Sequence, residues 1–171
     1  LKVVKDIYNE NTQQQIMILA HNKSLLKYLH DAIEFRDIAP VGYYIGGMKD
    51  TELKKSEAKK IIIGTYAMAS EALDIKTLTT LVMATPKTDI TQAVGRILRT
   101  KDHTPLVIDF IDQHDVFLNQ WKKRKSYYKK ENYKIISCDS NEYNNIDYNT
   151  EYDPENKPKK KAPVRKCLIE L

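Results

Sequence analysis

The chain has 171 residues, of which 42% are hydrophobic and 30% are charged, as in an ordinary soluble globular protein. No apolar run approaches the roughly 18 residues that a membrane span needs, and the first residues lack the apolar stretch of a secretory signal. The net charge of +5 permits a polyanionic partner without establishing one. Two distant cysteines, with no Cys/His cluster at metal-ligand spacing, favour a reduced intracellular setting and predict no metal site.

Short apolar runs alternate with helical patterns through the first two-thirds of the chain. The expected strands cover residues 16–20, 41–45, 61–64, 78–84 and 105–111, with 133–137 as a further candidate. The expected helices cover residues 22–35, 49–59, 66–73, 88–99 and 115–133, and either Asn22 or Ser24 is expected to cap the first of them. Strands that are apolar on both faces and alternate with helices predict an open, mainly parallel α/β sheet covered on both sides. Such sheets bind ligands at the carboxyl ends of their strands.

The composition changes after about residue 138. Residues 139–171 have little apolar content, an acidic first half and the basic run PKKKAPVRK. We therefore expect one α/β domain over residues 1–138 and a poorly ordered polar/basic tail over 139–171. The basic run is either a nuclear address or, more simply, a nonspecific phosphate or partner contact. The chain does not begin with methionine, which is consistent with a piece of a longer protein.

Two polar stretches that follow expected strands are candidates for chemistry. GTYAMASEALDI places Thr65, Glu71 and Asp74 near one sheet edge. QAVGRILRT carries Arg96 and Arg99 three residues apart, so that both share a helix face, and their planar guanidinium groups suit phosphate or carboxylate. Each stretch alone also fits an ordinary helix with solvated polar residues.

The run from Gly42 to Lys49 superficially resembles a phosphate-binding loop, but the match fails. A P-loop needs Lys and then Ser or Thr directly after its last glycine, whereas here Met48 follows Gly47 and Asp50 follows the lysine. No DExx-type strand end follows either. The chain therefore lacks the parts that grip ATP and its metal ion.

Taken together, these stretches resemble the second RecA-like domain of superfamily 2 helicases and translocases. GTYAMASEALDIK is similar to helicase motif V, QAVGRILR is similar to motif VI, and IMILAHNKSLLKYL stands where motif IV stands. The resemblance covers about residues 15–133. The ending GRILR is closer to the DNA translocase branch of XPB and the type III restriction ATPases than to DEAD-box RNA helicases. The order of the stretches is most similar to helicases of poxviruses and other large cytoplasmic DNA viruses.

The resemblance implies the C-terminal motor domain of an ATP-dependent DNA helicase or translocase, inactive by itself, with RNA as an open alternative substrate. Arg96 and Arg99 would reach the γ-phosphate of ATP, which an N-terminal RecA-like domain would hold together with Mg²⁺. Other residues implied at the cofactor are Gln92, Gly95, Glu71 and Asp74. Ala72 stands where this family usually has glycine. A non-catalytic nucleic-acid or partner-binding module with the same fold is the other hypothesis.

The same resemblance implies a nucleic-acid grip that includes Thr65, Gly46, Gly47 and Met48. The expected closing helix adds Lys122 and Lys123 as phosphate contacts, although a basic helix face is more often simply solvated. A viral protein of this kind would act in the host cytoplasm or the virus particle, or in the nucleus if the basic run is an address. No membrane partner is expected.

Overall fold

The computed structural model describes residues 1–71, 75–97, 104–140, 143 and 149–156, with the backbone alone at 71, 96 and 97. The chain divides into two compact units, Leu1–Arg124 and Lys125–Leu171. The predicted division after residue 138 stays a prediction.

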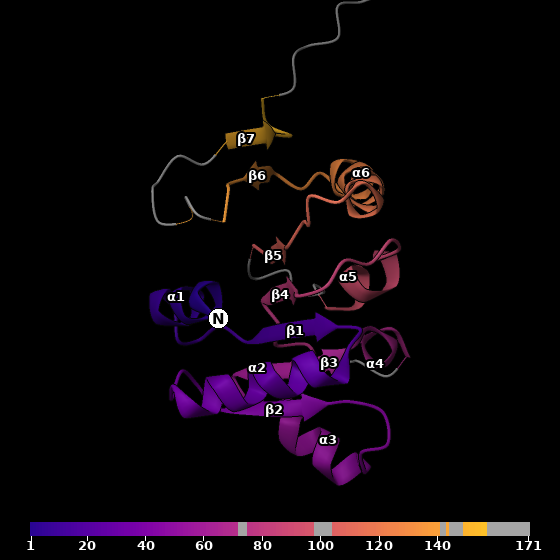
Figure 1. Cartoon of the computed structure of the whole chain (residues 1–171). Coiled ribbons are helices and arrows are strands. Elements are labelled where there is room, and N and C mark those ends of the chain that lie inside the picture. Colours follow the sequence, from indigo (N-terminus) through magenta and orange to yellow (C-terminus); the bar gives the residue numbers. More distant parts are fainter. Residues whose placement is uncertain (72–74, 98–103, 141–142, 144–148, 157–171) are drawn as a thin grey trace, which may run out of the picture. The chain divides into compact units, whose positions relative to one another are not determined.

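Five parallel strands form the sheet of the first unit, in the order β2-β3-β1-β4-β5 (Figure 1). The strands are β1 (Ile16–Ala20), β2 (Val41–Tyr44), β3 (Ile61–Thr65), β4 (Thr80–Met83) and β5 (Leu106–Asp109). All five match predicted strands. The three central strands are apolar and buried on both faces, which is the pattern of a sheet covered by helices on both sides.

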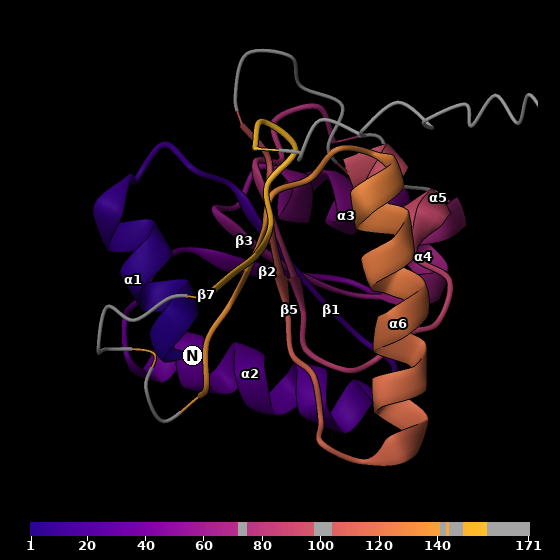
Figure 2. The same ribbon diagram turned by 90° about the horizontal axis from the view of Figure 1, so that it is seen from above.

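Helices cover both faces of this sheet. The helices of the first unit are α1 (Lys2–Glu10), α2 (Lys23–Phe35), α3 (Asp50–Glu57), α4 (Tyr66–Glu71), α5 (Thr91–Ile97) and the part of α6 (Asp115–Lys130) that ends at Arg124. Alternate residues of β1 and β3, such as Ile18 and Ile63, pack with buried residues of α1 and α2. Residues of opposite parity, such as Met17 and Ile62, are buried on the other face, where α3 and α4 lie (Figure 2). The predicted α/β fold is confirmed.

Two local features explain how the first strands and helices join. The Oδ1 atom of Asn22 accepts a hydrogen bond from the amide of Ser24 at 2.8 Å, so Asn22 is the predicted cap of α2. A Cβ atom at Gly64 would lie 2.7 Å from the carbonyl oxygen of Tyr44, so the close approach of β2 and β3 requires glycine there. Helix α1 was not predicted, although Val4 and Ile7 bury one face of it.

The second unit contains an antiparallel pair, β6 (Ile135–Ser137) and β7 (Asn149–Tyr152). β6 matches the candidate strand of the sequence, whereas β7 lies in the predicted tail and was not among the expected strands. Ion pairs support the pairing, because Lys125 binds Glu151 and the Nζ atom of Lys134 lies 3.1 Å from Asp153 Oδ2. The basic run lies outside the described residues. Within the described part of the chain, no helix is both long and apolar enough to cross a membrane.

Candidate functional site

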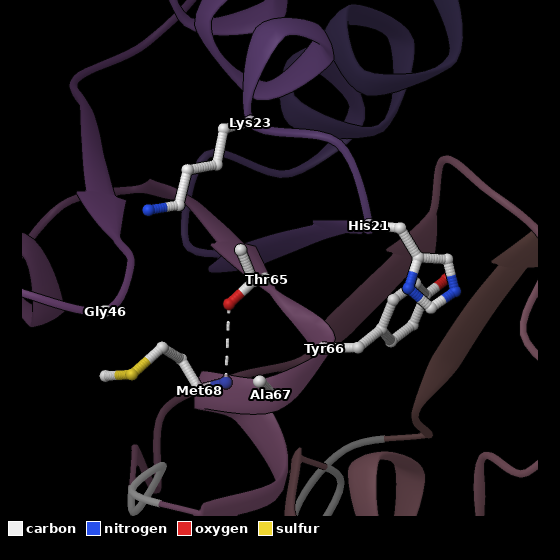
Figure 3. A pocket seen from close by; sticks show the side chains of 7 residues that line it. All are labelled: His21, Lys23, Gly46, Thr65, Tyr66, Ala67 and Met68. Atoms are coloured by element: carbon white, nitrogen blue, oxygen red, sulfur yellow. Dashed lines mark hydrogen bonds between the residues drawn. The ribbon is translucent and has the colours of Figure 1, made fainter.

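A hollow of about 390 Å³ lies where β1, β2 and β3 end (Figure 3). Its lining comes from the end of β3 and from residues shortly after the three strands: His21, Lys23, Gly46, Thr65, Tyr66, Ala67 and Met68. The carboxyl edge of a parallel sheet is the usual place for a ligand. The structure therefore brings together Thr65 and Gly46, two of the predicted nucleic-acid contacts, and adds His21 and Lys23, which sequence reasoning did not single out.

Lys23 and Thr65 give the hollow its hydrogen-bond donors. Lys23 is the first residue of α2, and its side chain extends toward the loop that holds Gly46 (Figure 3). The Oγ1 atom of Thr65 accepts a hydrogen bond from the amide of Met68 at 3.4 Å, which leaves the hydroxyl proton free to donate outward. No carboxylate is present among the described residues that line the hollow. The arrangement suits an anionic oxygen.

The loop after β2 contributes Gly46 to the lining of the hollow, whereas Gly47 and Met48, which follow it, are not lining residues. Gly47 has a φ angle of +92°, a backbone conformation that other L-residues adopt only under strain. A Cβ atom at Gly46 would find its nearest neighbour, the Met68 sulfur, 4.0 Å away, so the backbone there faces open space. Met48 follows and is half-buried. The backbone at Gly46 is therefore open to a ligand, and the predicted nucleic-acid contacts of these three residues stay a prediction.

The segment between β4 and α5, residues 85–87, is held by side chains from three different elements. The hydroxyl of Tyr66 donates to the carbonyl of Thr85 at 2.6 Å. His21 Nε2 lies 3.2 Å from the carbonyl of Pro86, and since a carbonyl only accepts, this nitrogen carries the proton. Arg124 donates from Nη1 to the carbonyl of Lys87 at 2.8 Å. We call these three hydrogen bonds the carbonyl clamp.

The predicted cofactor residues fall partly outside the described structure. Arg99 and Asp74 lie outside the described residues, as do the side chains of Arg96 and Glu71. Gln92 and Gly95 are exposed on α5, and a Cβ atom at Gly95 would meet nothing within 4 Å. Within the described residues, no three His, Cys, Asp or Glu side chains gather where a metal ion would bind. Gln92 and Gly95 thus lie on an exposed part of α5, and the role of these residues at a nucleotide stays a prediction.

Parts of this chain are similar in sequence to two viral proteins. A protein of Acanthamoeba polyphaga mimivirus named "Putative ATP-dependent RNA helicase L396" is 52% identical over 98 residues, which are 56% of this chain and 19% of that protein. An African swine fever virus protein named "Putative ATP-dependent RNA helicase QP509L" is 28% identical over 141 residues, which are 77% of this chain and 28% of that protein.

Solved structures support the same assignment at the level of the fold. The C-terminal domain of the DEAD-box protein Dbp5 superposes with a TM-score of 0.58 at 18% identity, over 76% of this chain and 77% of that one. The chain is a C-terminal RecA-like helicase domain. No protein-family model matches it. The chain spans about a fifth to a quarter of the length of the two viral relatives.

Helix α6 of the helicase domain corrects one expectation about its basic residues. A basic face on this helix was expected to be solvated, but Arg124, which directly follows Lys122 and Lys123, is fully buried. Its Nε and Nη2 atoms donate to the two carboxylate oxygens of Asp109, at 2.7 and 3.0 Å. Its guanidinium also lies 5.8 Å from the centroid of the Trp121 ring. Lys122 and Lys123, in contrast, are exposed, as a phosphate-contact role requires.

Changing Lys122 and Lys123 together to glutamate is expected to weaken nucleic-acid binding and to lower the slope of log K against log salt by about 1 to 2. Each lysine that contacts a phosphate releases counterions, so its loss reduces the salt dependence. Fluorescence anisotropy titrations between low and physiological salt measure this slope. An unchanged slope would show that this face of α6 is merely solvated.

Proposed function

We propose that the helicase domain is the second motor domain of an ATP-dependent nucleic-acid helicase or translocase. In this role it grips the backbone of one strand at the hollow and completes an ATP site that an N-terminal RecA-like domain mainly holds. The observation that supports the proposal is the hollow itself, where three adjacent strands end beside Lys23 and Thr65. The two viral relatives carry helicase names that agree with it.

The grip acts on phosphates, without regard to base sequence. The Lys23 ammonium supplies a point charge and the Thr65 hydroxyl supplies a directed donor, and both face one hollow. The glycine loop at 46–47 lets the strand approach the protein backbone. Contacts of this kind position a strand without reading its bases, which is what movement along a nucleic acid requires.

The second half of the proposal concerns Arg96 and Arg99. When bound by the N-terminal domain with Mg²⁺, ATP supplies a γ-phosphoryl group whose oxygens gain charge during hydrolysis. Helix α5 presents exposed Gln92 and Gly95, and Arg96 and Arg99 follow them in the sequence. An arginine supplied from a separate domain makes hydrolysis depend on domain closure. Closure then moves one nucleic-acid grip relative to the other.

Two versions of this function differ in the substrate, which is either DNA or RNA. Motif VI of this chain is most similar to DNA translocases, whereas both viral relatives are named as RNA helicases. The proposed grip on phosphates is compatible with DNA and with RNA. Parallel titrations with a single-stranded DNA and an RNA of the same sequence decide between them. In either version the protein would work inside the infected cell or in the virus particle.

Replacing Lys23 with alanine is expected to weaken single-strand binding by the chain about three- to tenfold and to lower the salt slope by about 1, equally for unrelated base sequences. The physical reason is the loss of one ammonium from a hollow that lacks carboxylates among its described lining residues. Anisotropy titrations at several salt concentrations, with both sugars, measure the effect.

The matched control is Lys59→Ala. This exposed lysine precedes β3 and therefore lies at the opposite edge of the sheet, yet its removal changes the net charge equally. It is expected to leave the affinity and slope nearly unchanged. If both variants lose affinity alike, the net charge and not the hollow determines binding, and the proposed grip is wrong.

A further inference from the structure

The carbonyl clamp holds three consecutive carbonyl groups, and each donor comes from a different element. Tyr66 begins α4, His21 follows β1, and Arg124 belongs to α6, all within the unit Leu1–Arg124. The amide of His21 also donates to the Thr85 hydroxyl at 3.0 Å. A short connection between a strand and a helix can follow its course without such side-chain hydrogen bonds. The clamp fixes the position of residues 85–87.

Two of the three donors also line the hollow. The rings of His21 and Tyr66 lie with centroids 4.7 Å apart, on the side of the hollow opposite Lys23 (Figure 3). The ammonium of Lys87 lies 4.9 Å from the centroid of the Tyr66 ring. Burial raises the pKa of the Tyr66 hydroxyl, so it keeps the proton that it donates to Thr85. A ligand that displaces either ring therefore acts directly on residues 85–87.

The same segment leads into α5 after only a few residues. The Oδ1 atom of Asp89 accepts a hydrogen bond from the amide of Thr91 at 3.0 Å, which caps the start of the helix. The next bond, from the amide of Val94 to the carbonyl of Ile90 at 2.8 Å, continues the helix. Residues 88–90 thus form a short, capped link between the clamp and α5, and Arg96 lies on that helix.

We propose that Tyr66, His21 and Arg124 are positioning residues. Through their hydrogen bonds to residues 85–87, a change at the hollow on ligand binding alters the position of α5. This inference rests on the proposed function, because it assumes that the hollow binds a nucleic-acid strand. Tyr66 and His21 respond to the strand, while Arg124, locked to Asp109, keeps the Lys87 end fixed. A change at the hollow therefore tilts α5, the helix to which Arg96 belongs, about this fixed end.

Hydrogen–deuterium exchange of the whole chain tests the inference without any enzymatic activity. Saturating single-stranded oligonucleotide is expected to change the exchange rate of α5 amides by about fivefold or more in the wild-type chain, a typical size for coupled sites. In Tyr66→Phe, which removes one hydroxyl and keeps the ring, the change is expected to fall below about twofold. The oligonucleotide affinity of each variant is measured alongside, so that exchange is compared at equal saturation.

The matched control is Tyr44→Phe, which removes a tyrosine hydroxyl bonded to Glu57 at 3.3 Å, away from the clamp. It is expected to retain the wild-type response of α5. Absence of oligonucleotide binding by the wild-type chain would overturn the proposed function and this inference together. Binding without any exchange response of α5, or an equal response in Tyr66→Phe, would overturn the inference alone and would leave the grip intact.

Discussion

Replacing Arg99 with alanine, in the chain joined to an N-terminal RecA-like domain, is expected to lower nucleic-acid-stimulated ATP hydrolysis by about 10³- to 10⁵-fold. This loss corresponds to about 4 to 7 kcal/mol of transition-state stabilisation. The expected cause is the loss of a guanidinium that offsets charge on the γ-phosphoryl oxygens during hydrolysis. A steady-state phosphate-release assay at saturating nucleic acid measures the rate, and Arg96→Ala is expected to act in the same direction.

The assignment requires that binding survives while hydrolysis fails. Single-strand affinity of Arg99→Ala is therefore expected to stay within about threefold of wild type, because binding depends on the hollow and on phosphate contacts. Arg36→Ala is the matched control, since it removes an exposed arginine at the end of α2, far along the chain from motif VI. Hydrolysis near the wild-type rate in Arg99→Ala would refute the arginine-finger assignment and would favour a non-catalytic binding module.

The sheet could be predicted because burial on both faces leaves a clear record in the sequence. IMILA and IIIGT are continuous apolar runs of strand length, and no solvated face interrupts them. The edge that carries the hollow followed from the same rule, which places ligands at strand carboxyl ends. His21 and Lys23 directly follow such an end, so the rule itself, applied to every strand, would have found them.

The burial of Arg124 could not be predicted from its neighbours in sequence, because the run Lys122–Lys125 consists only of basic residues. Its burial depends on Asp109, fifteen positions earlier at the end of β5, and on the carbonyl of Lys87. The available signal was chemical: one arginine among lysines offers a planar fork that binds a carboxylate through two hydrogen bonds. Spacing alone does not show which basic residue turns inward.

Strand β7 was missed for a different reason. NTEY has no apolar alternation, and its residues are exposed or half-buried. Its pairing with β6 is accompanied by ion pairs that involve Glu151 and Asp153. Such a strand depends on a partner distant in sequence more than on its own pattern, and strand propensity measures fit to neighbours. Local sequence reasoning therefore had no feature from which to predict it.

Replacing Arg124 with methionine is expected to lower the free energy of unfolding of the first unit by about 3 to 5 kcal/mol. Methionine has nearly the length of arginine but offers no donors, so the Asp109 carboxylate, whose side chain is 8% exposed, would stay buried and lose the two hydrogen bonds that Arg124 donates. The Lys87 carbonyl would lose its donor as well. Chemical denaturation, followed by circular dichroism, measures the difference.

The double variant Asp109→Leu with Arg124→Met distinguishes the contribution of the charge pair to stability from that of side-chain packing. Removing both charges takes away the buried carboxylate together with the guanidinium that pairs with it, so most of the lost stability is expected to return, even though the carbonyl of Lys87 stays without its donor. Restored stability, however, does not restore the clamp, because methionine cannot donate to that carbonyl. The double variant should therefore fold well and still show a weakened response of α5 to nucleic acid. A double variant no more stable than Arg124→Met would mean that packing of the arginine, not its charge pairing, stabilises the unit.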